Sequence, residues 1–316
     1  MAKPPRASGK KRSGVVHFVF RGHAARQKFF PVPARKETRT VLVEDGYGIT
    51  LEAEKKLSRI FSEPNVRKKI RFDVRPMSAS LNRGLAHAAS LGMRIASGEV
   101  TSNLGAFTRL MDRENRHKKS AVVNPTVANI RRYFETEARI MKIRHGLIRR
   151  RVRQIVEGGE APIDAYYGTA HSLLSRELKD EGIQTTRDID PIVFPGGGIL
   201  LRQLMRGKNP REISDAEYKR AFFSTRLNAK FNGRRFEFER DVYLRFFSIL
   251  KNTYVLQFSN EDIDGILDQF REAPGIGLKL NPEKTRMLIE EAMKIPLYRR
   301  MLSYPDMKKC IKKFTR

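Results

Sequence analysis

The segment Gly168-Thr-Ala-His171 places an imidazole between a predicted strand and a predicted helix. The strand is the short apolar and aromatic run Ile163–Tyr167. The helix covers Ser172–Glu181, and Gly182 is a suitable residue for its C-terminal end. A glycine allows close backbone approach, and free amides at a helix N-terminus favour an anion. We therefore interpret His171 as a candidate for chemistry; the alternative is a polar turn with a surface histidine.

Two other predicted strands also end in polar residues. Val15–Phe20 is mostly apolar, which predicts a central strand, and it is followed closely by His23. Thr40–Val43 is a second short strand, and Glu44 comes directly after it. Polar residues at strand ends of an α/β fold often line the crevice in which ligands bind. His23 and Glu44 are therefore candidate site residues beside His171.

A long amphipathic helix is predicted from about Thr126 to Val156. Its apolar stripe consists of Ile130, Phe134, Met141, Ile148, Val152 and Ile155, at spacings of three, four and seven residues. Between Met141 and Ile148 the stripe contains Arg144 and His145 instead of an apolar residue. An arginine directed towards a core costs desolvation unless it meets a carboxylate or an anionic ligand. Arg144 is thus a candidate anion-binding residue, unless its long side chain extends out to solvent.

The order of patterns predicts an α/β protein with a mixed, twisted sheet flanked by helices and a mainly helical C-terminal region. Further predicted elements are helices at 50–61 and 80–97, a half-exposed strand at 70–74, a partly strand-like segment at 185–194 and an apolar helix from about Ile199. Capping patterns at Ser259–Asp262 and Asn281–Pro282 predict two later helix starts. We expect a disordered basic tail at 1–13, an α/β domain at 14–190 and a helical region at 191–316.

The composition limits the classes of partner. Among the 316 residues, 63 Lys and Arg face 35 Asp and Glu, giving a net charge of +28. This excess predicts attraction to polyanions such as RNA, DNA or anionic membrane surfaces, although a chain that simply avoids acids would look the same. The single cysteine, Cys310, excludes an internal disulfide and a zinc site built on several thiolates. No apolar run reaches the ~20 residues of a membrane span, and no secretory signal is visible, so we expect a cytoplasmic protein.

The strand-end motifs together resemble a known superfamily. It includes TraB/PrgY proteins, TIKI-type metalloproteases, erythromycin esterases and ChaN-like haem-binding proteins. VVHFVFRGHA is similar to the first Gly/His strand of that group, TVLVEDG to the acidic second strand, KIRHGLIRRRVRQIV to the arginine helix and AYYGTAHSLLSRELKDEG to the last Gly-x-x-His motif. The similarity covers roughly residues 14–190. In this chain Gly22 and His23 are adjacent, and Arg21 stands where the superfamily commonly has an acid.

The resemblance implies that His23, Glu44 and His171 converge at one end of the sheet and bind a divalent metal, with Arg144 nearby to orient a substrate or stabilise an oxyanion. The expected function is then hydrolysis of an amide or ester bond in a small molecule or peptide. Without a metal, His171 or His23 would act as a general base oriented by Glu44. An inactive member of the superfamily, a non-catalytic nucleic-acid-binding protein and a helical docking protein are the alternatives.

Overall fold

The computed structural model describes residues 15–21, 37–44, 91–189, 196–231, 240–269 and 277–315, together with residues 52, 54, 55 and 88. The chain divides into two compact units. Of the described residues, the first unit holds those up to 102 together with 145–189. The second unit holds 103–144 and everything from 196 on. The boundary falls inside one long helix, between Arg144 and His145. The sequence had placed all of 14–190 in one domain.

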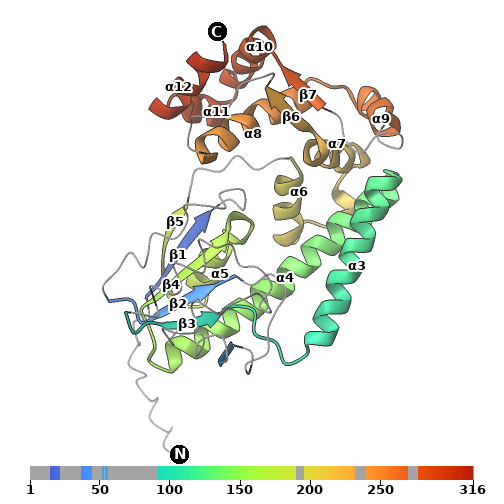
Figure 1. Cartoon of the computed structure of the whole chain (residues 1–316). Coiled ribbons are helices and arrows are strands. Elements are labelled where there is room, and N and C mark those ends of the chain that lie inside the picture. The colour runs from blue at the N-terminus through green and yellow to red at the C-terminus, as the bar shows by residue number, and fades with distance from the viewer. Residues whose placement is uncertain are drawn as a thin grey trace, which may run out of the picture. The chain divides into compact units, whose positions relative to one another are not determined.

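The first unit is built on a five-stranded sheet with the order β3-β2-β4-β1-β5 (Figure 1). Its strands are β1 (Val15–Arg21), β2 (Thr40–Val43), β3 (Arg94–Ser97), β4 (Ile163–Gly168) and β5 (Gln184–Ile189). Every pairing between these described strands is parallel, whereas a mixed sheet was expected. The α/β class itself is confirmed. Parallel strands all end at the same edge, so polar residues after several strands gather there.

The core of the first unit forms where apolar strands meet two helices. Each described residue of β2 and β4 is buried, which explains runs without alternation, because parallel strands are covered on both faces. Helix α4 (Val127–Glu157) supplies Ile148, Val152 and Ile155 to this core, and α5 (Leu174–Asp180) supplies Leu174 and Leu178. The predicted helix from Thr126 is confirmed, and its apolar stripe is buried along its whole length.

One predicted element is wrong over its C-terminal part, although Ala88 within it is helical. The segment 80–97 was expected to be a helix, but Arg94–Ser97 is strand β3, which pairs with β2. Leu91 and Ile95 have helical spacing, yet Leu91 is exposed and only Ile95 is buried. Tertiary pairing with β2 therefore overrides the local pattern. Of the helix predicted at 50–61, Glu52, Glu54 and Lys55 are helical; the rest, like the tail at 1–13, the strand at 70–74 and His23, lies outside the described residues.

The second unit is mainly helical, as predicted for the C-terminal region. It contains α3 (Leu104–Val123), the N-terminal part of α4, α6 (Gly196–Met205), α7 (Asp215–Arg226), α8 (Arg240–Leu256), α9 (Asn260–Gln269), α10 (Pro282–Met293), α11 (Pro296–Leu302) and α12 (Pro305–Phe314). A small parallel pair, β6 (Asn228–Phe231) and β7 (Gly277–Leu280), lies among them. Both predicted helix starts are confirmed: Ser259 and Asp262 cap each other's backbone, and Asn281 caps α10.

Candidate functional site

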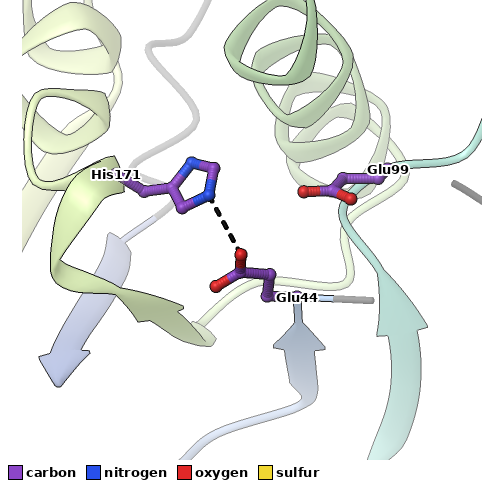
Figure 2. Close-up of side chains that lie close together, drawn as sticks. All are labelled: Glu44, Glu99 and His171. Carbon is purple, nitrogen blue, oxygen red and sulfur yellow. Dashed lines mark hydrogen bonds and ion pairs between the residues drawn. The ribbon is translucent and has the colours of Figure 1, made fainter. Parts of the chain in front are cut away.

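The strand order brings three polar residues to one edge of the sheet. Strands β3, β2 and β4 are neighbours, and their register aligns Ser97 with Val43 and Val43 with Tyr166. The C-terminal ends of these three strands therefore lie side by side, and they are followed by Glu99, Glu44 and the Gly168–His171 turn. Figure 2 shows the three side chains directed towards one another from these three strand ends. Their ligand atoms lie within 4.8 Å of one another.

Glu44 and His171 form a direct pair. His171 Nε2 lies 3.1 Å from Glu44 Oε1 (Figure 2). The second oxygen of Glu44, Oε2, accepts the Gly168 backbone N–H at 2.7 Å. The 3₁₀ turn Thr169–His171 after β4 carries the imidazole back over the strand end. His171 is 1% exposed, which excludes the surface-histidine interpretation. Both oxygens of Glu44 thus have a partner: Oε1 contacts the imidazole of His171, and Oε2 accepts the backbone N–H of Gly168.

Glu99 completes the cluster, and the turn before it is tightly held. The Gly98 N–H donates to Val43 O at 3.2 Å, and the Glu99 N–H donates to Ser97 Oγ at 3.1 Å. At Gly98 a Cβ would overlap the Tyr167 hydroxyl, so only glycine fits there without movement of the ring. Glu99 is completely buried. The backbone therefore delivers its carboxylate to the interior of the strand-end crevice.

A buried ion cluster anchors the same end of β3. Glu54 is 3% exposed, and its Oε2 accepts the Ser97 N–H at 2.9 Å. Its other oxygen pairs with Arg151 of α4 and with Arg94 of β3, the latter at 3.3 Å. Removing one partner from a buried pair is costly because the other charge stays desolvated. This cluster fixes β3 and α4 relative to each other beside Glu99.

The donor set and its spacing suit a divalent metal. Two ligand atoms bound at about 2.1 Å to a tetrahedral ion lie about 3.4 Å apart, close to the 3.1 Å between His171 Nε2 and Glu44 Oε1. Two carboxylates and one imidazole suit Zn²⁺, Mn²⁺ or Fe²⁺ better than they suit a soft metal ion, which prefers sulfur ligands. The Gly168 amide would orient the Glu44 carboxylate, as supporting hydrogen bonds do in metal sites. Glu44, Glu99 and His171 are therefore a possible metal-binding triad.

A second histidine lies against the triad. The His145 ring of α4 is 5.2 Å from the His171 ring, centroid to centroid, and Tyr167 lies 5.4 Å from His171 on another side. His145 Nδ1 is 3.1 Å from Glu177 Oε2. Burial raises the pKa of Glu177, but the hydrogen bond and charge of His145, with the charge of Arg149, outweigh it and hold that pKa below its ordinary value. Glu177 therefore stays ionised and keeps the His145 ring in place.

The structure brings together only some of the site residues that were predicted from the sequence. Glu44 and His171 meet as the resemblance implied, whereas His23 lies outside the described residues. Arg144 belongs to the second unit. It is mostly buried, its Nη1 lies 3.8 Å from Met141 Sδ, and its charge acts on Glu114. Burial nevertheless raises the pKa of Glu114 against that charge and the charge of Lys118.

Sequence reasoning missed Glu99, although a usable pattern was present. Ile95-Ala96-Ser97 is followed by Gly98-Glu99, which repeats the pattern of an apolar strand followed by an acid seen at Thr40–Val43 and Glu44. The extension of the predicted helix to Ser97 hid this repetition. His145 was noted only as an interruption of the apolar stripe.

Comparison with known proteins adds no assignment: no family model matches the chain, and neither the curated proteins nor the solved structures give a match. Within the part of the chain that the structure describes, no helix has the length and apolar character needed to cross a membrane.

Proposed function

We propose that the chain is a hydrolase of amide or ester bonds that uses a divalent metal held by Glu44, Glu99 and His171. The supporting observation is the convergence of two carboxylates and one imidazole, all largely buried, at the strand-end edge of a parallel sheet. Ligands of α/β sheets bind at that edge. The similarity to TraB/PrgY proteins, TIKI-type metalloproteases and erythromycin esterases supports the same reaction class. The substrate would be a small molecule or a peptide.

Each residue of the site has a distinct role in the proposed reaction. A bound divalent metal supplies Lewis acidity and a bound water of lowered pKa. Glu44, Glu99 and His171 hold it, and Gly168 keeps Glu44 oriented through its N–H. If the protein acts without a metal, the Glu44–His171 pair is already a carboxylate-oriented imidazole, so His171 would accept a proton from the attacking water. Both routes need His171 and Glu44.

The first experiment is metal content by mass spectrometry on the purified full chain. We expect near-stoichiometric divalent metal in the unchanged protein and in His117→Ala, and its loss in His171→Ala. His117 is a fair control because it bonds Thr136 on the α3–α4 helices of the second unit. Chromogenic ester and amide substrates are then tested with and without a chelator. Equal metal content in all three proteins would refute the proposed site.

The net charge of +28 favours a second candidate function, binding of RNA or DNA. In the second unit, α11 and α12 expose basic side chains while their other faces bury Tyr298, Met301, Met307, Cys310 and Phe314. The exposed set is Arg299, Arg300, Lys308, Lys309 and Lys312. Lys309 pairs with Asp306 within one helical turn, an exposed contact that contributes little. This surface would neutralise phosphates.

Salt dependence tests the second function. Each neutralised phosphate releases a counterion, so the logarithm of affinity should fall linearly with the logarithm of salt concentration. A triple variant, Arg300→Gln, Lys308→Gln and Lys312→Gln, should weaken binding of a single-stranded oligonucleotide and flatten this slope by about two to three. No binding at low salt, or an unchanged slope, would rule out this surface.

A further inference from the structure

His145 carries a buried nitrogen that the proposed function does not use. The side chain is 2% exposed, and among the described residues its Nε2 has no hydrogen-bond partner. A buried polar atom without a partner is costly, and native structures rarely leave one without a reason. Its other nitrogen, Nδ1, faces both Glu177 oxygens at 3.1 and 3.2 Å. When Nδ1–H donates to Glu177, the lone pair of Nε2 is left to accept a ligand.

The position of this ring agrees with ligation beside His171. The two ring centroids are 5.2 Å apart, with 32° between the ring planes. If two imidazoles bind one tetrahedral ion at about 2.1 Å, and each centroid lies about 1.2 Å beyond its nitrogen, the centroids are about 5 Å apart. The observed spacing is close to that of two imidazoles that share one ion, but the group whose ligand atoms already lie within 4.8 Å of one another holds only Glu44, Glu99 and His171, so the His145 ring must move towards them when the ion binds. A histidine whose other nitrogen is held by a carboxylate is also the usual form of a metal-bound histidine.

The rigid support of His145 strengthens this argument. Glu177 belongs to α5, and Arg149 of α4 lies 3.7 Å from it while also pairing with Glu181 at 2.8 Å. Arg153 holds the second oxygen of Glu181 at 2.6 Å. Helices α4 and α5 are thus joined by a series of ion pairs that begins at Glu177, beside the imidazole. The ring is therefore held beside His171 before any ligand arrives, so that only its approach to the triad is left for the binding step.

We infer that His145 is a fourth protein ligand of the proposed metal site, and that Glu177 positions it. The inference rests on the proposed function, because it needs the triad of Glu44, Glu99 and His171. It changes the character of the centre from two carboxylates and one imidazole to two of each. Because the proposed hydrolysis also needs a bound water, an ion with these four protein ligands would have to be at least five-coordinate. The mixed set favours Zn²⁺, Mn²⁺ or Fe²⁺ over Mg²⁺, which prefers oxygen ligands and retained waters.

The test measures metal affinity, with Zn²⁺ alone as the probe. Isothermal titration of the metal-stripped full chain is compared with His145→Leu, Glu177→Gln, His171→Ala and the control His117→Ala. Leucine keeps the bulk of the buried ring and removes its nitrogens, and thermal unfolding of each variant checks that it is folded. Co²⁺ absorption spectra of the same proteins report the ligand set directly, independently of any activity.

We expect His145→Leu to weaken Zn²⁺ binding by at least about 100-fold, Glu177→Gln by about 10–100-fold, and His117→Ala not at all. The Co²⁺ spectrum should change in His145→Leu. Full affinity and an unchanged spectrum in His145→Leu, with binding lost in His171→Ala, would overturn the inference while leaving the triad intact. If His145→Leu does not fold, Glu177→Gln decides: full affinity there overturns the inference. Zn²⁺ binding that is absent from the unchanged protein, or unaffected in His171→Ala, would overturn the proposed function as well.

Discussion

The most demanding prediction concerns Gly98, the residue between β3 and Glu99. A Cβ on Gly98 would overlap the Tyr167 hydroxyl and would lie 2.9 Å from Tyr167 Cζ and 3.3 Å from Ile148 Cγ1. Tyr167 is 3% exposed and Ile148 is completely buried, so neither side chain has open space to enter. Overpacking a core of this kind costs about 1–3 kcal/mol. We expect Gly98→Ala to destabilise the protein by about that amount.

A double-mutant cycle separates this overlap from other effects of the added methyl. Tyr167→Phe removes the hydroxyl with which the Cβ would overlap, so Gly98→Ala should cost less in the Tyr167→Phe protein than in the unchanged one. The coupling should be about 1 kcal/mol, within the usual range for residues in contact. It should not remove the whole cost, because the contacts with Cζ and with Ile148 remain. Urea unfolding of the four proteins, followed by circular dichroism, measures all terms.

Gly146→Ala is the matched control for Gly98→Ala. Gly146 lies inside α4, and a Cβ there meets no atom within 4 Å. Alanine is a better helix former than glycine, so this variant should gain about 0.5–1 kcal/mol. If Gly98→Ala is as stable as the unchanged protein, or costs the same with and without the Tyr167 hydroxyl, the packing described at the β3 end is refuted.

Three further predictions concern both units. Burial raises the pKa of the Cys310 thiol to about 11, so the folded protein should react slowly with a maleimide at pH 8 and rapidly in denaturant. Because the unfolded thiol ionises first, unfolding free energy should fall by up to about 2 kcal/mol between about pH 9 and pH 11, and Cys310→Ala should lack this loss. Ser214→Ala should cost about 1 kcal/mol in thermal unfolding, since it removes the capping box with Glu217. Ile148→Ala should cost about 2–5 kcal/mol in urea unfolding, because Ile148 is completely buried between α4 and the sheet.

Much of the first unit could be predicted from local pattern. The strands at Val15–Phe20, Thr40–Val43 and Ile163–Tyr167 are apolar runs bounded by polar or glycine residues, and the helix from Thr126 has a long apolar stripe that is interrupted only at Arg144 and His145. These elements can be recognised from the local sequence alone. Strand β3 cannot, since it has four residues and follows a segment with helical spacing. Only its pairing with β2 makes Arg94–Ser97 a strand.

The site was predicted only as far as the strand ends were recognised. Glu44 and His171 follow strands with clear patterns, so both were found. Glu99 follows the strand that was taken for a helix, and it was missed for that reason alone. The lateral order β3-β2-β4, which makes these ends neighbours, depends on long-range pairing and is not written in any local spacing. His145 was seen in the sequence, but its contacts with Glu177 and His171 depend on how α4 and α5 pack on the sheet.

The charge of the chain and the charge of the site have opposite signs, and this separates the two proposed functions. The protein carries +28, yet its strand-end crevice gathers two carboxylates around His171. A polyanion that approached the two carboxylates would be repelled by them unless a cation balanced their charge. Metal binding and nucleic-acid binding therefore use different residues and respond differently to change. Gln substitutions on α11 and α12 should leave Zn²⁺ affinity unaltered, whereas His171→Ala should leave the salt dependence of oligonucleotide binding unaltered. An effect of either set on both properties would mean that one surface serves both ligands.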